Sequence, residues 1–418
     1  MKTLFKNANV YMNGEFKKQD MLLCGAVLSV FRGEESYDVV IDGGIAIFPG
    51  FCDVHVHFRE PGFSYKETVK SGSRAAARGG YTAVCTMPNL SPAPDCLESL
   101  KAQLDIIERD SVIATLPYGT ITKGQMGQEL SDMEAMAPFV VGFSDDGRGV
   151  QSEEVMEAAM LKAKSLGKPI VAHCEDNSLL RGGYIHDGEY ARAHGHRGIP
   201  SESEWGPIAR DLKLVNKTGV TYHVCHVSAK ESVRIIREAK RQGLDVSCET
   251  GPHYLTMDDG DLMEEGRFKM NPPIRGREDK EELVLGITDG TVDAIATDHA
   301  PHSAEEKSRG LEKSLMGVVG IETAFPVIYT DLVLEGKITL TDAVRLLSDR
   351  PRERFNITND PGFTVFKLDE EYEINPCEFI SMGKSSPFSG KRVYGRCLCT
   401  VYDGKVAYLD ERLKDSIV

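Results

Sequence analysis

The sequence predicts an α/β protein, a (β/α)8 barrel of the TIM type with a small β domain built from both chain termini. From about residue 46, short apolar runs alternate with longer amphipathic stretches, a pattern typical of βα units and a parallel sheet. Eight such units over about 300 residues favour a closed barrel over an open sheet. The segments before and after this region are both rich in short strands and turns. Neither is large enough to form a stable sheet alone, so we expect them to join beside the barrel.

Three domain segments follow from this division: residues 1–48, 49–361 and 362–418. The first contains short strand-like stretches broken by Asn13-Gly14 and by Asp42-Gly43-Gly44, with no convincing helix. The last ends in CTVYDGKVAYL, where Asp403-Gly404 has the composition of a hairpin turn. The middle segment is predicted to be the barrel.

The barrel strands are expected at eight apolar runs, each followed by polar residues or a helical pattern. The clearest helices are predicted at 152–168, with apolar residues three and four apart and a glycine stop, and at 229–243. The eight candidate strands are residues 45–58, 81–87, 112–120, 139–143, 169–175, 221–227, 245–250 and 292–299.

Composition excludes several classes of protein. The formal net charge of -15, from 49 Lys and Arg against 64 Asp and Glu, argues against a nucleic-acid partner, because phosphate binding needs clustered basic residues. Ten scattered cysteines with no C-x-x-C motif favour a reducing compartment over a disulfide scaffold. The N-terminal stretch lacks the apolar core of a signal peptide, and no run of 18 apolar residues is present. We therefore expect a cytoplasmic protein with no membrane partner.

Polar residues able to bind metal or substrate end nearly every candidate strand. Because the carboxyl ends of barrel strands converge on one mouth, we expect these side chains to form one site there. In strand order they are Asp53, His55, His57, Arg59; Asn89; Asp145, Asp146; His173; His223, His226; His253; and Asp298, His299, His302.

His55-Val56-His57 is the sharpest single motif. Residues i and i+2 of a strand point to the same face, so both imidazoles can reach one ion. His173, His226 and Asp298 at later strand ends make too many ligands for one catalytic zinc, which takes three protein ligands. This ligand set predicts two divalent ions about 3.5–4 Å apart with a shared oxygen ligand.

Two ions that close need an anionic bridge. In barrels of this kind the bridge is often a carboxylated lysine after the fourth strand, but no lysine lies between Lys123 and Lys162. The segment Phe143-Ser144-Asp145-Asp146-Gly147 stands there instead, and either aspartate can supply the bridge directly. A bridging carboxylate, Asp298 and a shared water-derived oxygen leave a small positive charge, which suits a site that polarises a carbonyl.

Seven motifs follow one another along the chain: DVHVHFREPG at 53–62, TMPN at 86–89, FSDDG at 143–147, AHCEDNSL at 172–179, HVCHVSA at 223–229, MNPPIR at 270–275 and ATDHAPH at 296–302. In this order they resemble dihydroorotase, the bacterial type I form within the amidohydrolase superfamily. The resemblance runs from about residue 45 to 365 and continues more weakly into 385–395 and 400–406.

The resemblance implies two Zn²⁺ per chain and a role for each matching residue. His55, His57 and Asp298 would bind the first ion, His173 and His226 the second, and Asp146 would bridge them, with Asp145 the alternative. GPHY at 251–254 departs from the family's more usual Pro-His-His, so no role is carried over to His253. The residues that fall where the family binds substrate are His57, Arg59, Asn89, Asn271, His302 and the backbone near Gly317.

The activity implied is the reversible hydrolysis of (S)-dihydroorotate to N-carbamoyl-L-aspartate, in the de novo pyrimidine (UMP) pathway. Asp298 would act as the catalytic proton carrier between the attacking water and the leaving nitrogen. Family members are often dimers, so a homodimer is expected alongside the small-molecule substrate. Two alternatives stay open: a related cyclic amidohydrolase such as hydantoinase or allantoinase, and a non-catalytic barrel that serves as a scaffold.

Overall fold

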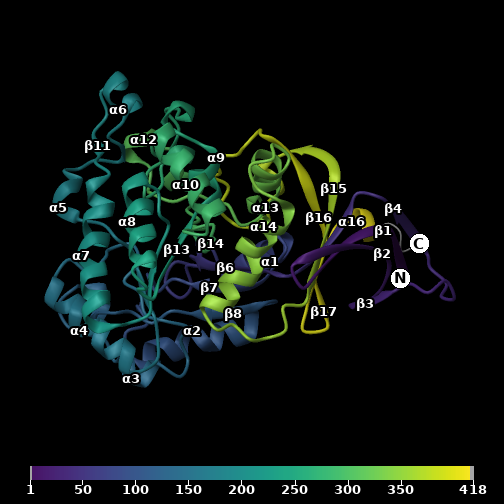
Figure 1. Cartoon of the computed structure of the whole chain (residues 1–418), viewed down its shortest axis with the longest axis horizontal. Coiled ribbons are helices and arrows are strands. Elements are labelled where there is room, and N and C mark those ends of the chain that lie inside the picture. The colour runs from purple at the N-terminus through teal and green to yellow at the C-terminus, as the bar shows by residue number, and fades with distance from the viewer. Residues whose placement is uncertain (1, 415–418) are drawn as a thin grey trace.

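The computed structural model describes residues 2–414 and confirms the predicted architecture, a barrel with a β sheet from both chain ends beside it (Figure 1). Two parallel sheets form most of the barrel wall, in the orders β6-β7-β8 and β14-β13-β12-β9. Isolated bridges close the circle, because Phe143 joins Gly119 to Ile170 and Val56 pairs with His299. The barrel strands are β6 (Phe51–Val56), β7 (Tyr81–Thr86), β8 (Ala114–Pro117), β9 (Ile170–Ala172), β12 (Tyr222–Val224), β13 (Val246–Thr250) and β14 (Ala294–Ile295).

Two strand predictions are wrong in detail. Residues 45–58 are not one strand: the chain turns at Gly50, where an added Cβ would lie 2.1 Å from Thr82 Oγ1, so β5 (Ile45–Pro49) and β6 belong to different sheets. Residues 139–143 form no strand, and only Phe143 pairs with its neighbours. The apolar run indicated a buried wall position, and the backbone does contact the wall through the Phe143 bridges and through Val141 N, which donates to Pro117 O, but these contacts form no continuous ladder.

Helices cover the outside of the barrel and follow the strands in alternation. The predicted helix at 152–168 is α4 (Glu153–Ser165), which Ser152 caps by accepting from Val155 N, and the one at 229–243 is α8 (Lys230–Arg241). The other helices are α1 (Val69–Arg78), α2 (Leu97–Asp110), α3 (Met133–Met136), α5 (Asn177–Leu180), α6 (Glu189–His194), α7 (Glu202–Thr218), α9 (Pro252–Thr256), α10 (Arg277–Asp289), α11 (Ala304–Lys307), α12 (Gly310–Lys313), α13 (Ala324–Ile328), α14 (Leu340–Val344), α15 (Arg350–Arg354) and α16 (Glu411–Lys414).

Shorter elements interrupt the loops above the barrel and the last helices. A two-stranded ribbon lies within the long insertion after β9, on either side of α6. Its strands are β10 (Ile185–His186) and β11 (Gly198–Ile199), and the short helical turns are η1 (Lys123–Gln125), η2 (Asp259–Asp261), η3 (Gly266–Phe268), η4 (Tyr329–Val333), η5 (Arg345–Asp349) and η6 (Pro376–Glu378). None of the helices within residues 2–414 is both long and apolar enough to cross a membrane.

The sheet beside the barrel contains strands from both ends of the chain, as predicted. Its order is β17-β16-β15-β5-β1-β2-β3, with β4 paired to β1, and β5 is antiparallel to β15 from Phe363↔Pro49 to Lys367↔Ile45. The Asp403-Gly404 turn joins β16 to β17 as an antiparallel hairpin. Where the domains divide, at residues 48 and 361, stays a prediction. The strands are β1 (Lys2–Met12), β2 (Glu15–Cys24), β3 (Val27–Val30), β4 (Val39–Asp42), β15 (Phe363–Glu373), β16 (Arg392–Tyr402) and β17 (Lys405–Leu409).

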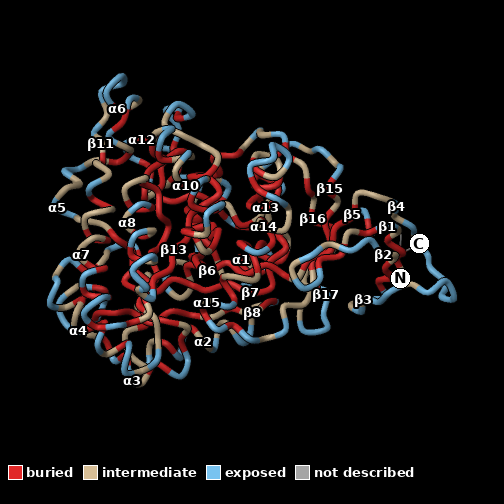
Figure 2. Tube along the Cα trace, viewed as in Figure 1, coloured by how far each residue is buried: buried red, intermediate tan, exposed pale blue. Residues whose placement is uncertain are grey.

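The main core lies between the barrel wall and its helices and continues to the side where the second sheet packs (Figure 2). Phe48 and Phe366 of the sheet contact Phe51 and Phe325 of the barrel, with ring centroids 4.4–5.8 Å apart. All four rings are almost fully buried. This aromatic cluster fixes the sheet against the side of the barrel, away from the mouth.

Candidate metal centre and substrate pocket

Six predicted ligands come together at the carboxyl ends of the barrel strands. His55 lies on β6 and His57 directly follows it, Asp146 follows the bridging Phe143, and the other three follow β9, β12 and β14. Their side chains are buried. The full set is His55, His57, Asp146, His173, His226 and Asp298.

Asp146 faces all four histidines. Its Oδ1 lies 3.4 Å from His55 Nε2, 3.4 Å from His173 Nδ1 and 3.5 Å from His226 Nε2, and its Oδ2 lies 3.5 Å from His57 Nε2. Such a carboxylate, central to two pairs of imidazoles, has the position that a bridging ligand needs.

Asp145 points away from the histidines. Its carboxylate accepts hydrogen bonds from the backbone N–H groups of Ile121 and Thr122 and from the Thr122 hydroxyl. It therefore anchors the loop after β8. Of the two aspartates that the sequence left open, Asp146 is the one that lies among the candidate ligands.

Asp298 lies beside the first histidine pair. Its Oδ1 is 3.0 Å from His57 Nε2 and 3.5 Å from His55 Nε2. Both Asp298 and His226 have left-handed backbone, with φ of 45° and 35°. Non-glycine residues seldom adopt this conformation, and where they do the surrounding structure holds them there.

The donor atoms form overlapping groups that could hold metal ions. His55 Nε2 and Asp146 Oδ1 are fully buried and have no hydrogen-bond partner, an arrangement that is costly unless another group occupies the space between them. Two sets of donor atoms, each within 4.8 Å of one another, share Asp146: His55–His57–Asp146 and Asp146–His173–His226. Imidazole nitrogen and carboxylate oxygen are ligands that zinc and similar ions prefer.

The charged groups of the cluster shift one another's pKa values. Burial opposes protonation of His55, but Asp146, Glu249 and Asp298 outweigh it and raise the pKa of His55 well above its usual value. Burial likewise raises the pKa of Asp146, yet the facing histidines, His55 above all, hold it well below its ordinary value. The carboxylates of the cluster therefore favour positive charge among the histidines, which a bound divalent ion would also supply.

A pocket of about 210 Å³ opens above this centre. Every residue expected to bind substrate lines it, and His55 is absent from its wall because it lies beneath. The predicted residues that line the pocket are His57, Arg59, Asn89, Asp146, His173, His226, Asn271, Asp298, His302 and Gly317.

One side of the pocket carries the cationic and amide groups. Arg59, with left-handed backbone at φ 58°, is held by a bond from its Nε to Pro301 O at 3.2 Å. Asn89 Oδ1 lies 2.8 Å from His57 Nδ1. The amide oxygen therefore accepts a hydrogen bond from the protonated Nδ1, which leaves Nε2 free to bind an ion. Because only Nε is used in this bond, the two terminal nitrogens of the guanidinium can donate to a carboxylate.

His302, which follows Pro301 in the chain, is held by hydrogen bonds between loops. His302 Nε2 lies 2.8 Å from Met316 O, and Lys66 Nζ lies 3.1 Å from His302 Nδ1. Burial, together with Arg59, lowers the pKa of His302 to about 3, so its imidazole is neutral. The Gly317 N–H, which the resemblance offers to substrate, donates to Lys269 O at 3.1 Å in this structure.

Two carboxylates beside the ligands were not predicted, the partly exposed Glu175 and the buried Glu249. Glu175 Oε2 lies 3.5 Å from His173 Nε2, and its Oε1 accepts from Asn271 Nδ2 at 2.8 Å. Glu249, on β13, lies 2.6 Å from His55 Nδ1. The signal for Glu249 was a carboxylate inside an otherwise buried strand sequence, which requires a partner.

Three other strand-end residues lie outside the pocket. Asp53 is fully buried and accepts from Thr297 and from His55 N, so it joins the first strand to the last. Burial raises its pKa to about 7. His253 is also buried, with no hydrogen-bond partner for Nε2, and burial lowers its pKa to about 4. His223 bonds to Ser247 and Glu249 below the ligands.

Comparison with known proteins identifies relatives over the whole length. A chain from Fusobacterium nucleatum named "Dihydroorotase" is 49% identical over 421 residues, covering 98% of this chain and 99% of that protein. Proteins of the same name from Staphylococcus aureus and Bacillus cereus are each 44% identical, covering 97% and 98% of this chain and 99% of their own length.

Solved structures and a family profile complete the comparison. The L-hydantoinase of Arthrobacter aurescens superposes with a TM-score of 0.83 at 24% identity, covering 97% of this chain and 95% of that one, and supports the fold. The dihydropyrimidinase of Brevibacillus agri gives 0.82 at 21% identity, covering 98% and 96%. The profile described as "Dihydro-orotase-like" matches residues 44–232. With full-length relatives at 44–49% identity, the chain belongs to the dihydroorotase family.

Proposed function

We propose that this chain is a dihydroorotase, a zinc-dependent cyclic amide hydrolase. It would interconvert (S)-dihydroorotate and N-carbamoyl-L-aspartate in the pathway that makes UMP. The observation that carries the proposal is Asp146, whose carboxylate lies within 3.5 Å of four histidines at the floor of a pocket that Arg59 also lines. The names of the full-length relatives support the same activity.

The metal content we propose is two Zn²⁺ per chain. His55, His57 and Asp298 would hold one ion, His173 and His226 the other, and Asp146 would contribute to both. Divalent ions held there supply a Lewis acid that polarises the amide carbonyl and acidifies the attacking water. The chain's own residues bind the substrate, orient it and move the proton.

Substrate recognition would depend on the carboxylate that dihydroorotate carries. The Arg59 guanidinium presents a planar pair of donors, and Asn89 and Asn271 add amide groups from other sides of the pocket. His302 is neutral and held by Lys66 and Met316, so it would shape this wall without adding charge. The Gly317 N–H would donate a hydrogen bond to the substrate, which requires it to give up its present bond to Lys269 O.

Asp298 would carry the proton. Its Oδ1 is 3.0 Å from His57 Nε2, at the pocket edge of the first ligand group. From that place the carboxylate accepts a proton from the attacking water and passes it to the ring nitrogen as the C–N bond breaks. Ring closure uses the same transfer in reverse.

Hydantoinase activity is the alternative that the fold neighbours raise. Two features of this chain argue against it. Asp146, and no lysine, lies among the histidines where we propose the bridging ligand. Arg59 lines the pocket, whereas many hydantoinase substrates have no carboxylate for it to bind. A homodimer in the cytoplasm remains part of the proposal, as the family resemblance implies.

The test is an assay of ring opening by loss of dihydroorotate's ultraviolet absorbance. We expect turnover by the purified full-length protein, loss of turnover with a strong chelator, and recovery on adding Zn²⁺. Hydantoin and dihydrouracil, which lack the carboxylate, serve as comparison substrates. Faster turnover of either one than of dihydroorotate would reassign the activity.

A further inference from the structure

Glu249 lies in the middle of the barrel, directly beneath the candidate metal centre. It belongs to β13 and is fully buried, and it does not line the pocket. It therefore touches neither substrate nor solvent. A buried carboxylate carries a large desolvation cost unless hydrogen bonds from other groups offset it.

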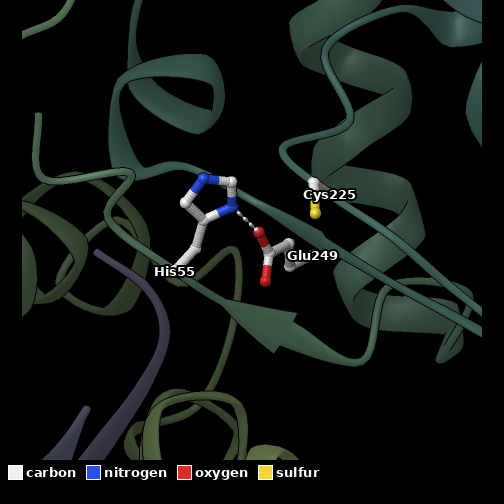
Figure 3. A group of neighbouring side chains, drawn as sticks. All are labelled: His55, Cys225 and Glu249. Carbon is white, nitrogen blue, oxygen red and sulfur yellow. Dashed lines mark hydrogen bonds and ion pairs between the residues drawn. The ribbon is translucent and has the colours of Figure 1, made fainter. Parts of the chain in front are cut away.

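The contacts of its Oε1 reach both ligand groups. His55 Nδ1 lies 2.6 Å from this oxygen (Figure 3), and the backbone N–H of His226 donates to it at 3.3 Å. His55 belongs to the set with His57, and His226 to the set with His173. One oxygen atom thus supports one member of each set.

The short contact decides the tautomer of His55. A carboxylate oxygen has no proton to give at this distance, so Nδ1 carries the proton and donates it. With an ion bound in place of the second proton, the lone pair of the ring would be on Nε2, which lies 3.4 Å from Asp146 and 3.5 Å from Asp298. The partner on one ring nitrogen selects the other as the metal ligand.

The second oxygen of Glu249 is also held. His223 Nε2 lies 3.1 Å from Oε2, and His223 Nδ1 lies 2.7 Å from Ser247 Oγ. Glu249, His223 and Ser247 are all buried within the barrel. With both oxygens bonded, the carboxylate cannot rotate away from His55.

Cys225 stands next to this pair, and His55, Cys225 and Glu249 have the spacing of a third metal group (Figure 3). The bond between His55 and Glu249 already uses both of those groups, however. Burial also raises the pKa of the Cys225 thiol well above its usual value, so the thiol stays protonated and is a poor ligand.

We infer that Glu249 is a positioning residue for the metal centre, which orients His55 through its side chain and His226 through its backbone. The inference rests on the proposed two-metal function and deepens it. Outer carboxylates of this kind typically account for about 10–100-fold in metal affinity. Because Glu249 supports a ligand from each set, its loss should weaken binding of both ions.

The test measures zinc binding directly. Metal-free full-length protein is titrated with Zn²⁺ against a chromophoric chelator, and the bound metal is counted by elemental analysis. We expect two ions in the parent, weaker binding of both in Glu249→Gln, and a loss of about 10–100-fold in Glu249→Leu, which has no acceptor. The matched control is Asp211→Asn: Asp211 is equally buried, but its partners are Arg210 and Tyr222.

Parent-like affinity in both Glu249 variants would overturn the inference while leaving the two-metal centre intact. Failure of the parent itself to bind zinc would instead remove the proposed function, and this inference with it. A second measurement needs no variant of Glu249. In zinc-loaded parent labelled with ¹⁵N-histidine, the His55 ring should show a protonated Nδ1 with a strongly downfield proton, assigned by its loss in His55→Asn. An unprotonated Nδ1 would refute the positioning role.

Discussion

Replacing Asp298 with asparagine should separate its two proposed roles, metal ligand and proton carrier. The substitution keeps the size of the side chain and one oxygen that can face His57 and His55. It also suits the backbone, because asparagine tolerates the left-handed conformation found at this position, with φ of 45°. The folded structure and part of the metal affinity should therefore survive.

The magnitude follows from what the amide lacks. The carboxylate Oδ1 lies 3.0 Å from His57 Nε2, at the edge of the pocket where water and the leaving nitrogen must meet. An amide cannot accept a proton from the attacking water. Positioned acid–base groups contribute roughly 10²–10⁴-fold, so we expect kcat to fall by at least about 100-fold, or about 2.7 kcal/mol in the barrier.

The assay follows dihydroorotate absorbance in both directions, with the zinc content of each preparation measured on the same sample. Rates are expressed per chain that carries both ions, which removes any effect of weaker binding. The reasoning would be refuted by an Asp298→Asn protein with two bound ions and a turnover within about tenfold of the parent, well short of the acid–base contribution. Asp298 would then be a ligand and no more.

Three further results are expected. Arg59→Lys keeps the charge but loses the fork, so kcat/KM for dihydroorotate should fall by about 2 kcal/mol or more, roughly 30-fold; an unchanged value would exclude two-pronged binding. Asp146→Ala should lose most of the bound zinc and the activity together, and elemental analysis showing two ions would place the bridge elsewhere. Lys307 is buried near Lys269, and its pKa is lowered to about 7 from 10.5. Between those values the unfolded chain holds a proton that the folded chain lacks, so the free energy of unfolding should rise with pH by up to about 1.4 kcal/mol per unit. Urea unfolding of metal-free protein at pH 7, 8 and 9 measures this slope, and Lys307→Met should flatten it; equal slopes would contradict the assignment.

The barrel could be predicted from the sequence because the alternation of apolar runs and amphipathic stretches is local and is repeated along the chain. Nearly every apolar run ends in polar residues, which predicts that His55, His57, His173, His226 and Asp298, with Asp145 or Asp146, lie at one mouth. The predicted strand at 139–143 is wrong because apolar character reports burial and not a continuous hydrogen-bond ladder. Phe143 alone forms bridges there, and Val141 N and Ser144 N add single hydrogen bonds to Pro117 O and Gly119 O.

The supporting residues could not be predicted because their roles depend on contacts across the barrel. Glu249 reaches His55 on a strand distant in the sequence, and Glu175 reaches Asn271 in another loop. The choice between Asp145 and Asp146 was likewise decided by Thr122, whose hydroxyl and N–H draw Asp145 aside. Gly317 illustrates the same limit, because its N–H is already bonded to Lys269 O.

The shared sheet has a consequence for the order in which the ribosome delivers the chain. Strand β5 emerges with the first residues, but its partner β15 is translated only after the whole barrel. Throughout that interval one edge of β5 is unpaired, and such an edge can pair with another nascent chain. The ring of Phe48, on that strand, also lacks its contact with Phe366 until β15 has been translated. Premature termination anywhere inside the barrel thus yields a product with an open, apolar edge, which quality-control proteases and chaperones can recognise.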